Sequence, residues 1–117
     1  MAKMNTYERA VQIYQVLISA AHHRQLLTYD IVGKLIGVPR QGLAPHLEHP
    51  LNYCVKNKLP ALTSICVSAK TGQPSHGFTD RQPMTPETLH EEREAVYAHE
   101  WYRDLPLTAG QLENSST

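Results

Sequence analysis

Apolar residues recur at a helical interval in the first part of the chain. From Tyr7 to about Gln25 they stand three or four positions apart, at Tyr7, Ala10, Val11, Tyr14, Leu17, Ile18 and Ala21. That interval places them on one face of an α-helix. The pattern therefore predicts a first helix with one buried side.

A second, shorter helix is predicted over residues 29–36. Its apolar positions are expected to share one face, and they are Ile31, Val32, Leu35 and Ile36. Thr28 stands at the N-cap, where its hydroxyl can accept a hydrogen bond from a free backbone N–H. Gly37 marks the end, because glycine readily adopts the left-handed conformation that stops a helix.

A third helix is predicted within residues 43–58, after Pro39 and a Gln41–Gly42 turn. We expect its regular part to begin after Pro50, because proline is best tolerated in the first helical turn. Its inward face would consist of Leu47, Leu51, Cys54 and Val55.

The residues after Pro60 change in character and predict β-structure. Residues 61–69 are β-branched and alternating, which is typical of a strand. Residues 70–73 have turn chemistry, and we expect Pro74–Phe78 to return as a short strand. Three helices followed by a β-hairpin are the layout of a winged helix-turn-helix. The predicted fold is therefore mainly α with a small β-hairpin, of class α+β.

A fourth helix is predicted from an N-cap at Thr85 to about Tyr102, because Pro86 and Glu87 suit a first helical turn. Its apolar positions are Leu89, Val96, Tyr97 and Trp101. The residues beyond Pro106 are small and polar. We therefore expect a winged-helix domain over residues 1–80, an acidic helix packed on it over residues 81–105, and a flexible tail over residues 106–117.

Charge is divided unevenly between two parts of the chain. The 117 residues, enough for one domain with a modest core, carry 11 basic and 11 acidic side chains, so the formal net charge is zero. Residues 1–79 hold eight of the basic and three of the acidic side chains, whereas residues 80–117 hold three and eight. Neutrality therefore does not exclude a polyanionic partner, and the basic first part favours one.

The stretch from Leu27 to Gly37 carries a resemblance to a known family. A predicted helix precedes this stretch, and a third helix, Leu59–Pro60 and a predicted strand follow it. In this arrangement the stretch resembles the DNA-binding winged-helix domain of O6-alkylguanine alkyltransferases and alkyltransferase-like proteins. The resemblance covers residues 7–78. It implies the winged-helix scaffold and its use on duplex DNA.

The chemistry of that family is not carried over with its scaffold. Its alkyl-accepting cysteine lies in a Pro-Cys-His-Arg segment, whereas the matching region here, Thr63–Val67, holds Cys66 without that proline, histidine and arginine. The segment from Tyr53 to Phe78 also resembles a bacterial domain family of unassigned function. We therefore expect no catalytic residue.

The leading hypothesis is a non-catalytic protein that binds duplex DNA, as a regulator or an accessory subunit. A winged helix usually presents its third helix to the major groove and its wing to the DNA backbone. The expected DNA contacts are Tyr29 and Lys34 in the second helix, Arg40, Gln41, His46, Asn52, Lys56 and Lys58 in the turn and third helix, and Lys70, Thr71, Gln73 and His76 in the wing.

No metal or other cofactor is expected. His46 and His49 are three positions apart and can lie close together, but a zinc site needs three or four converging ligands. Neither Cys-x-x-Cys nor His-Glu-x-x-His spacing occurs. Surface histidines are the simpler interpretation.

Two alternatives stay open at this point. The acidic fourth helix can present a surface to a second copy or another protein, with Tyr97 and Trp101 as anchors. Cys66 can carry out alkyl transfer or another thiol reaction if a base and a positive environment are in reach. No run of about 18 apolar residues and no secretion signal is seen, so we expect a cytoplasmic protein that does not enter a membrane.

Overall fold

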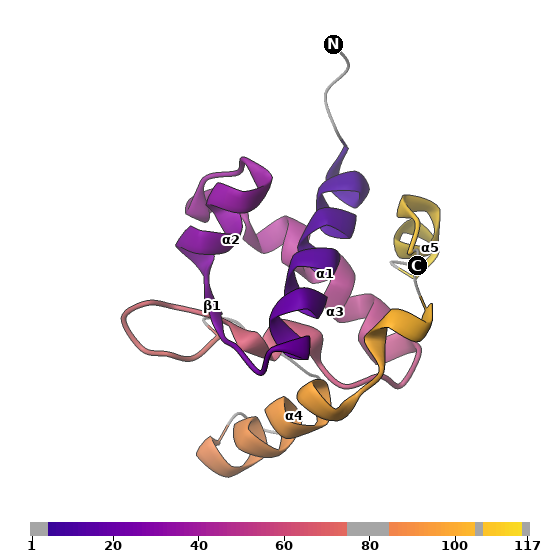
Figure 1. Ribbon diagram of the computed structural model, residues 1–117. Coiled ribbons are helices and arrows are strands. Elements are labelled where there is room, and N and C mark those ends of the chain that lie inside the picture. The colour runs from indigo at the N-terminus through magenta and orange to yellow at the C-terminus, as the bar shows by residue number, and fades with distance from the viewer. Residues whose placement is uncertain (1–4, 75–84, 105–106, 116–117) are drawn as a thin grey trace.

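The long first helix, α1 (Thr6–His22), lies at the centre of the domain (Figure 1). The structure is a computed structural model that describes residues 5–74, 85–104 and 107–115. Asn5 caps the helix, because its side chain accepts a hydrogen bond from the Glu8 N–H at 2.9 Å and the Glu8 carboxylate accepts one from the Asn5 N–H. The predicted apolar face is confirmed at Ala10, Tyr14, Leu17, Ile18 and Ala21, all buried.

The second helix, α2 (Tyr29–Ile36), has the predicted bounds and follows a two-residue strand, β1 (Leu27–Thr28). The Thr28 hydroxyl accepts a hydrogen bond from the Ile31 N–H at 3.2 Å, and Gly37 ends the helix with a φ of 77°. The expectation of one shared apolar face is wrong. Val32 and Ile36 are buried, whereas Ile31 and Leu35 are exposed. Only the side of α2 that carries Val32 and Ile36 packs against the core.

The third helix, α3 (Ala44–Lys56), starts before Pro50, contrary to the expectation from sequence. A short 3-10 turn, η1 (Arg40–Gly42), leads into it. Pro50 lacks the N–H that would bond to the carbonyl four residues earlier. Its ring is nonetheless fully buried, and packing of α3 against α1 offsets the missing hydrogen bond.

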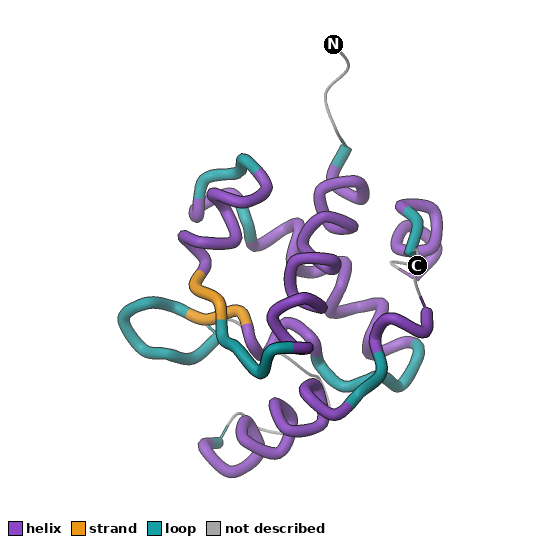
Figure 2. The backbone as a smooth tube through the Cα atoms, in the orientation of Figure 1, coloured by secondary structure: helices purple, strands orange, loops and turns teal. Residues whose placement is uncertain are grey.

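The predicted hairpin wing is not what the described residues form. Residues 62–65 form a 3-10 helix, η2 (Leu62–Ile65), and only Cys66–Val67 is a strand, β2. This strand pairs in parallel with β1, Leu27 opposite Cys66 and Thr28 opposite Val67 (Figure 2). The chain then turns back in a loop, and the expected return strand beyond Pro74 lies outside the described residues. The fold is therefore mainly helical, with five helices and a two-strand parallel sheet in the described part.

The acidic helix, α4 (Pro86–Ala98), runs below α1 in Figure 1 and ends earlier than predicted. The Trp101 indole N–H donates to the Val96 carbonyl at 2.8 Å. That carbonyl would otherwise accept from the next helical turn, so the chain leaves the α-helix and forms a 3-10 turn, η3 (Trp101–Asp104). Arg93 holds α4 to the core by donating to the carbonyls of Ser64 and Gly72, both at 3.1 Å.

The expected flexible tail over residues 106–117 contains a packed helix, α5 (Ala109–Ser115). Thr108 and Gln111 form its capping box: the Gln111 side chain accepts from the Thr108 N–H at 2.8 Å, and the Thr108 hydroxyl accepts from the Gln111 N–H at 3.2 Å. Leu107 and Leu112 are buried, and α5 packs against α1 and α3. Among the described helices, none has the length and apolar character needed to cross a membrane.

Candidate nucleic-acid interface

Two surface segments, η1 and the loop after β2, contribute residues to one cavity near the start of α3. The loop after β2 is closed by the Ser68 N–H, which donates to the Gln73 carbonyl at 2.9 Å, and it projects from the domain in Figure 2. A cavity of about 310 Å³ is lined by Arg40 and Gln41 from η1 and by Ser68 from that loop. The structure therefore brings together two segments that are far apart in the sequence.

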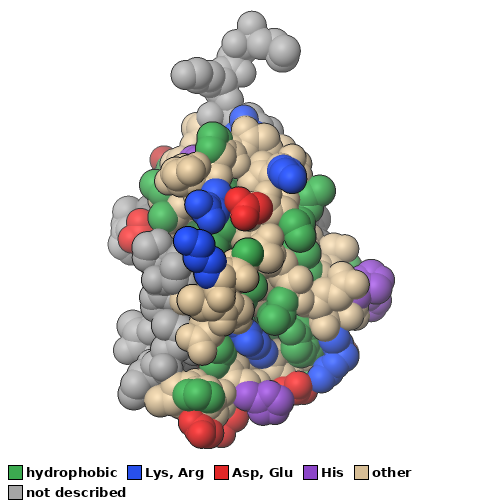
Figure 3. All heavy atoms as spheres, turned by 90° about the vertical axis from the view of Figure 1, so that its left-hand side faces the viewer, with side chains coloured by type: hydrophobic (Ala, Val, Ile, Leu, Met, Phe, Trp, Pro, Cys, Tyr) green, Lys and Arg blue, Asp and Glu red, His purple; other side chains and the backbone are tan. Residues whose placement is uncertain are grey.

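Six of the predicted DNA contacts are exposed on α2, η1 and this loop, and we refer to them as the basic face: Lys34, Arg40, Gln41, Lys70, Thr71 and Gln73. Figure 3 shows Lys and Arg side chains gathered on this side of the molecule, with an acidic group among them. Arg40 Nε lies 3.8 Å from Asp30 Oδ1, and both side chains are about half exposed. Water screens such a pair, so Arg40 keeps most of its attraction for an external anion.

The other predicted contacts do not join the basic face. Tyr29 is 8% exposed and belongs to the core. Thr6 Oγ1 on α1 lies 2.8 Å from His46 Nδ1, and Lys56 Nζ donates to the Asn114 carbonyl at the end of α5. The remaining three are Asn52, which is half-buried, Lys58, which is exposed beyond the far end of α3, and His76, which lies outside the described residues.

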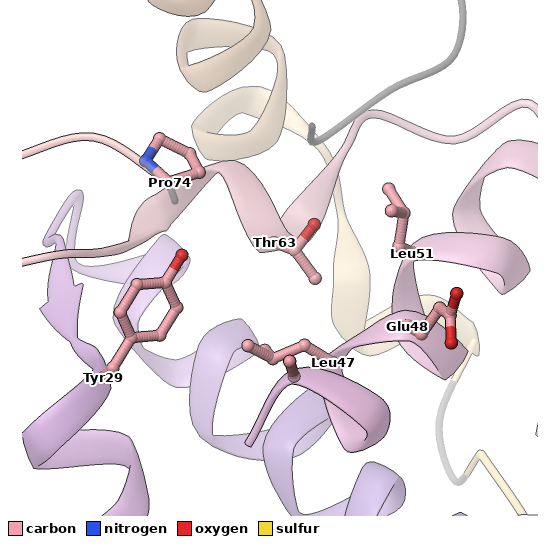
Figure 4. Close-up of a pocket in the computed structure, with 7 residues that line it drawn as sticks. Tyr29, Leu47, Glu48, Leu51, Thr63 and Pro74 are labelled. Atoms are coloured by element: carbon pink, nitrogen blue, oxygen red, sulfur yellow. The ribbon is translucent and has the colours of Figure 1, made fainter. Parts of the chain in front are cut away.

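An apolar cavity of about 290 Å³ adjoins the basic face under the first half of α3. In Figure 4, Thr63 lies between Tyr29 and Pro74 on one side and Leu51 on the other, with Leu47 below. The Thr63 hydroxyl oxygen is buried and has no hydrogen-bond partner within the described ranges. Sequence reasoning missed this cavity because it placed residues 61–69 in a strand.

Cys66 does not have the environment of a reactive thiol. Its side chain is 1% exposed, and burial raises its pKa to about 12. Nucleophilic attack requires the thiolate, which such a pKa suppresses at neutral pH. Its neighbours Ile65 and Val67 are buried as well. Burial thus weighs against alkyl transfer at Cys66.

The two histidines of α3 contact the start of α1. His49 Nε2 lies 3.2 Å from the same Thr6 Oγ1 that His46 contacts, and the His49 ring packs on Tyr7 with centroids 4.5 Å apart. Desolvation lowers the pKa of His49, because burial disfavours the charged form of the ring. Within the described part of the chain, His, Cys, Asp and Glu side chains form no group of three suited to a metal.

The anchors proposed for a protein partner are engaged within the domain. Trp101 is 3% exposed and packs edge-on against Tyr14, with ring centroids 6.1 Å apart. Tyr97 is half-buried, and the Arg24 guanidinium lies 4.9 Å from its ring centroid. Among the described residues of the α-helices, the exposed large apolar side chains are Ile31 and Leu35 of α2, at 45% and 62%.

Comparison with protein-family models, curated proteins and solved structures found no match for this chain. The interpretation of its surfaces therefore depends on the residues of the chain itself. The strongest functional feature among them is the basic face, because it combines cations and hydrogen-bonding groups from α2, η1 and the loop after β2.

Proposed function

We propose that this protein binds duplex DNA without catalysis, through the basic face. The observation that carries the proposal is that Arg40 and Gln41 of η1 and Ser68, where the loop over residues 68–73 begins, line one cavity beside the start of α3. Lys34, Arg40 and Lys70 supply charge for phosphates, while Gln41 and Gln73 supply amide groups that can bond to phosphates or base edges.

The geometry limits how α3 takes part in this contact. Only the first turn of α3 adjoins η1, and Glu48 is exposed one turn further along the helix. A carboxylate there repels phosphates, so the DNA backbone is expected to lie over η1 and the loop rather than along the whole helix. Binding is accordingly expected to be weak and strongly dependent on salt.

Titration of a labelled duplex at about 50 mM and about 200 mM salt tests the proposal. The variant Lys70→Gln removes a cation of the basic face that has no acidic partner in the described residues, and Lys58→Gln removes a cation beyond the opposite end of α3 as a matched control. The slope of log K against log salt is expected to fall by about 0.9 for each phosphate that the protein no longer neutralises. Lys70→Gln should show this decrease, and Lys58→Gln should keep the slope of the unmodified protein.

Three outcomes would refute DNA binding through this face. The first is no binding at low salt, and the second is binding that is indifferent to salt. The third is equal weakening by Lys70→Gln and Lys58→Gln, which would indicate diffuse attraction to the whole surface.

Self-association is a second candidate, favoured by the apolar ridge of Ile31 and Leu35. Asp30 and Lys34 are one turn apart beside this ridge, so two copies of α2 packed antiparallel would bring opposite charges together. Light scattering over a range of protein concentrations tests it, with Leu35→Asp expected to abolish any dimer. A monomer at every concentration would exclude this candidate.

A further inference from the structure

The two cavities beside the start of α3 adjoin one another. The cavity of about 310 Å³ next to η1 and the apolar cavity of about 290 Å³ under α3 share three lining residues, Tyr29, Ala44 and Leu47. Each volume is close to the lower limit of the range of about 300–1,000 Å³ that is usual for small-molecule sites. A ligand of that kind would therefore extend from one cavity into the other.

The cavity next to η1 has a cationic rim that solvent reaches. The Arg40 side chain is 49% exposed, and Gln41, which lines the same cavity, is exposed as well. Arg40 Nε lies 3.8 Å from Asp30 Oδ1, which is longer than a hydrogen bond, so this pairing leaves the guanidinium N–H groups for another acceptor.

The charges at this rim select the kind of anion. A guanidinium binds a carboxylate through two parallel hydrogen bonds. Arg40 is a single cation, and Asp30 beside it repels negative charge. A carboxylate, with one negative charge, therefore suits the rim better than a doubly charged phosphate monoester does.

The adjoining cavity is lined by apolar side chains that remain open to a ligand. Leu51 stands on one side and Leu47 below in Figure 4. Leu51 is half-buried, and Ala44, which lines both cavities, is exposed. Glu48 lines this cavity too, and its carboxylate disfavours a second negative charge there. An uncharged apolar chain suits this part of the site.

We propose that the two cavities together bind a monocarboxylate with a medium-length apolar chain. The carboxylate pairs with Arg40 at the rim, and the chain passes Ala44 and packs against Leu51. Arg40 belongs to the basic face as well, but the proposal does not depend on DNA binding.

Octanoate is the probe, titrated into the full ¹⁵N-labelled chain below the concentration at which it forms micelles, while the backbone amide signals are followed by NMR. Saturable shifts are expected at the amides of Gln41, Ala44 and Leu51. The affinity should rise from butanoate to octanoate by up to about 4-fold for each methylene, the value of its transfer out of water. Shifts that never saturate, shifts gathered at α4 and η3 instead, or equal affinities for the two acids would overturn the proposal.

Two variants and a second ligand separate the proposed ion pair from apolar packing. Arg40→Gln should weaken octanoate binding about 2- to 5-fold, as expected for a partly exposed ion pair, and should leave the affinity for octanol unchanged. Lys58→Gln removes a cation beyond the far end of α3 and should bind both ligands like the unmodified protein. Equal effects of Arg40→Gln on octanoate and octanol, or equal weakening of octanoate binding by both variants, would overturn the ion pair.

A third variant tests the path of the chain between the cavities. Ala44→Glu places a longer, negatively charged side chain at a residue that lines both. Ala44 is exposed in the first turn of α3, where an acidic side chain is favourable, so the fold should be kept. Octanoate binding should be lost, and binding as tight as in the unmodified protein would overturn the proposal. None of these measurements involves DNA, so failure of this proposal is distinguishable from failure of duplex binding.

Discussion

Replacement of Leu112 by alanine tests whether α5 is an integral part of the core. Leu112 is fully buried between α5, α1 and α3, in a segment whose composition predicts a flexible tail. Alanine has the highest helix propensity, so the substitution does not itself disfavour the helix. Any loss of stability therefore reports the packing of the side chain.

The expected loss of stability follows from burial and from the position of α5. A fully buried leucine replaced by alanine costs about 2–5 kcal/mol, depending on how far the neighbours close the cavity. The seven residues of α5 span only about 10 Å, so this short helix can shift toward the space that is left. We expect a decrease of about 2–3 kcal/mol, out of the total of about 5–15 kcal/mol that is usual for a domain.

Urea unfolding followed by circular dichroism measures this decrease, and a thermal scan should show a melting temperature lower by roughly 8–12 °C. Leu35→Ala is the matched control, because the same atoms are removed from a side chain that is 62% exposed. The control should change the stability by about 0.5 kcal/mol or less. Equal urea midpoints for the two variants would refute the packing of α5.

Three further predictions concern single residues. Desolvation lowers the pKa of His49, so the unfolded chain binds a proton at this residue more readily than the folded protein does. The contribution of His49 to stability is therefore complete above about pH 6.5 and is lost as the pH falls below that value. The urea midpoint should be lower near pH 5.5 than near pH 7.5, and His49→Gln should reduce that difference. Cys66, with a pKa of about 12, should resist alkylation by iodoacetamide in the native protein and react once denaturant unfolds it; prompt native labelling at Cys66 would contradict this. A Cβ at Gly33 would lie 2.4 Å from the Val38 carbonyl oxygen, so Gly33→Ala should lower the melting temperature, whereas Gly110→Ala, which meets nothing closer than 3.9 Å, should leave it equal or higher.

Local signals predicted the helices well where capping residues and apolar periodicity agree. Thr28 and Gly37 delimit α2 as expected, because each makes a contact that depends only on its neighbours in sequence. The end of α4 could not be predicted, since it depends on the Trp101 side chain reaching the Val96 carbonyl. The capping box of Thr108 and Gln111 was a readable signal for α5 that composition obscured.

The β-structure was mispredicted for a tertiary reason. Residues 61–67 are all buried, and a continuous buried run has no alternation that would separate a strand from a 3-10 turn. The partner of β2 is a strand that precedes α2, and no local pattern gives that pairing. Parallel partners are set by how the intervening helices pack.

Of the side chains predicted to contact DNA, some share one exposed face and others do not. Lys34, Arg40 and Lys70 are exposed, as their charge alone would indicate. Lys56 has the same chemistry, yet its ammonium group is held by a carbonyl of α5, a helix that was not expected. The exposure of Leu35 on α2 was missed because periodicity does not show which of two adjacent apolar ridges meets the core.

The parallel pairing of β1 and β2 also has a consequence for the order of folding. The four paired residues contribute little enthalpy. Their pairing brings the segment before α2 next to the segment after η2, which closes a long loop. The entropic cost of closing this loop is more than the two-strand ladder can offset alone. The ladder should therefore form after α1, α2 and α3 have assembled, and its amides should exchange hydrogen faster than those of α1. The loop over residues 68–73 leaves directly from β2, so this half of the basic face gains its position in a late step of folding and loses it in an early step of unfolding.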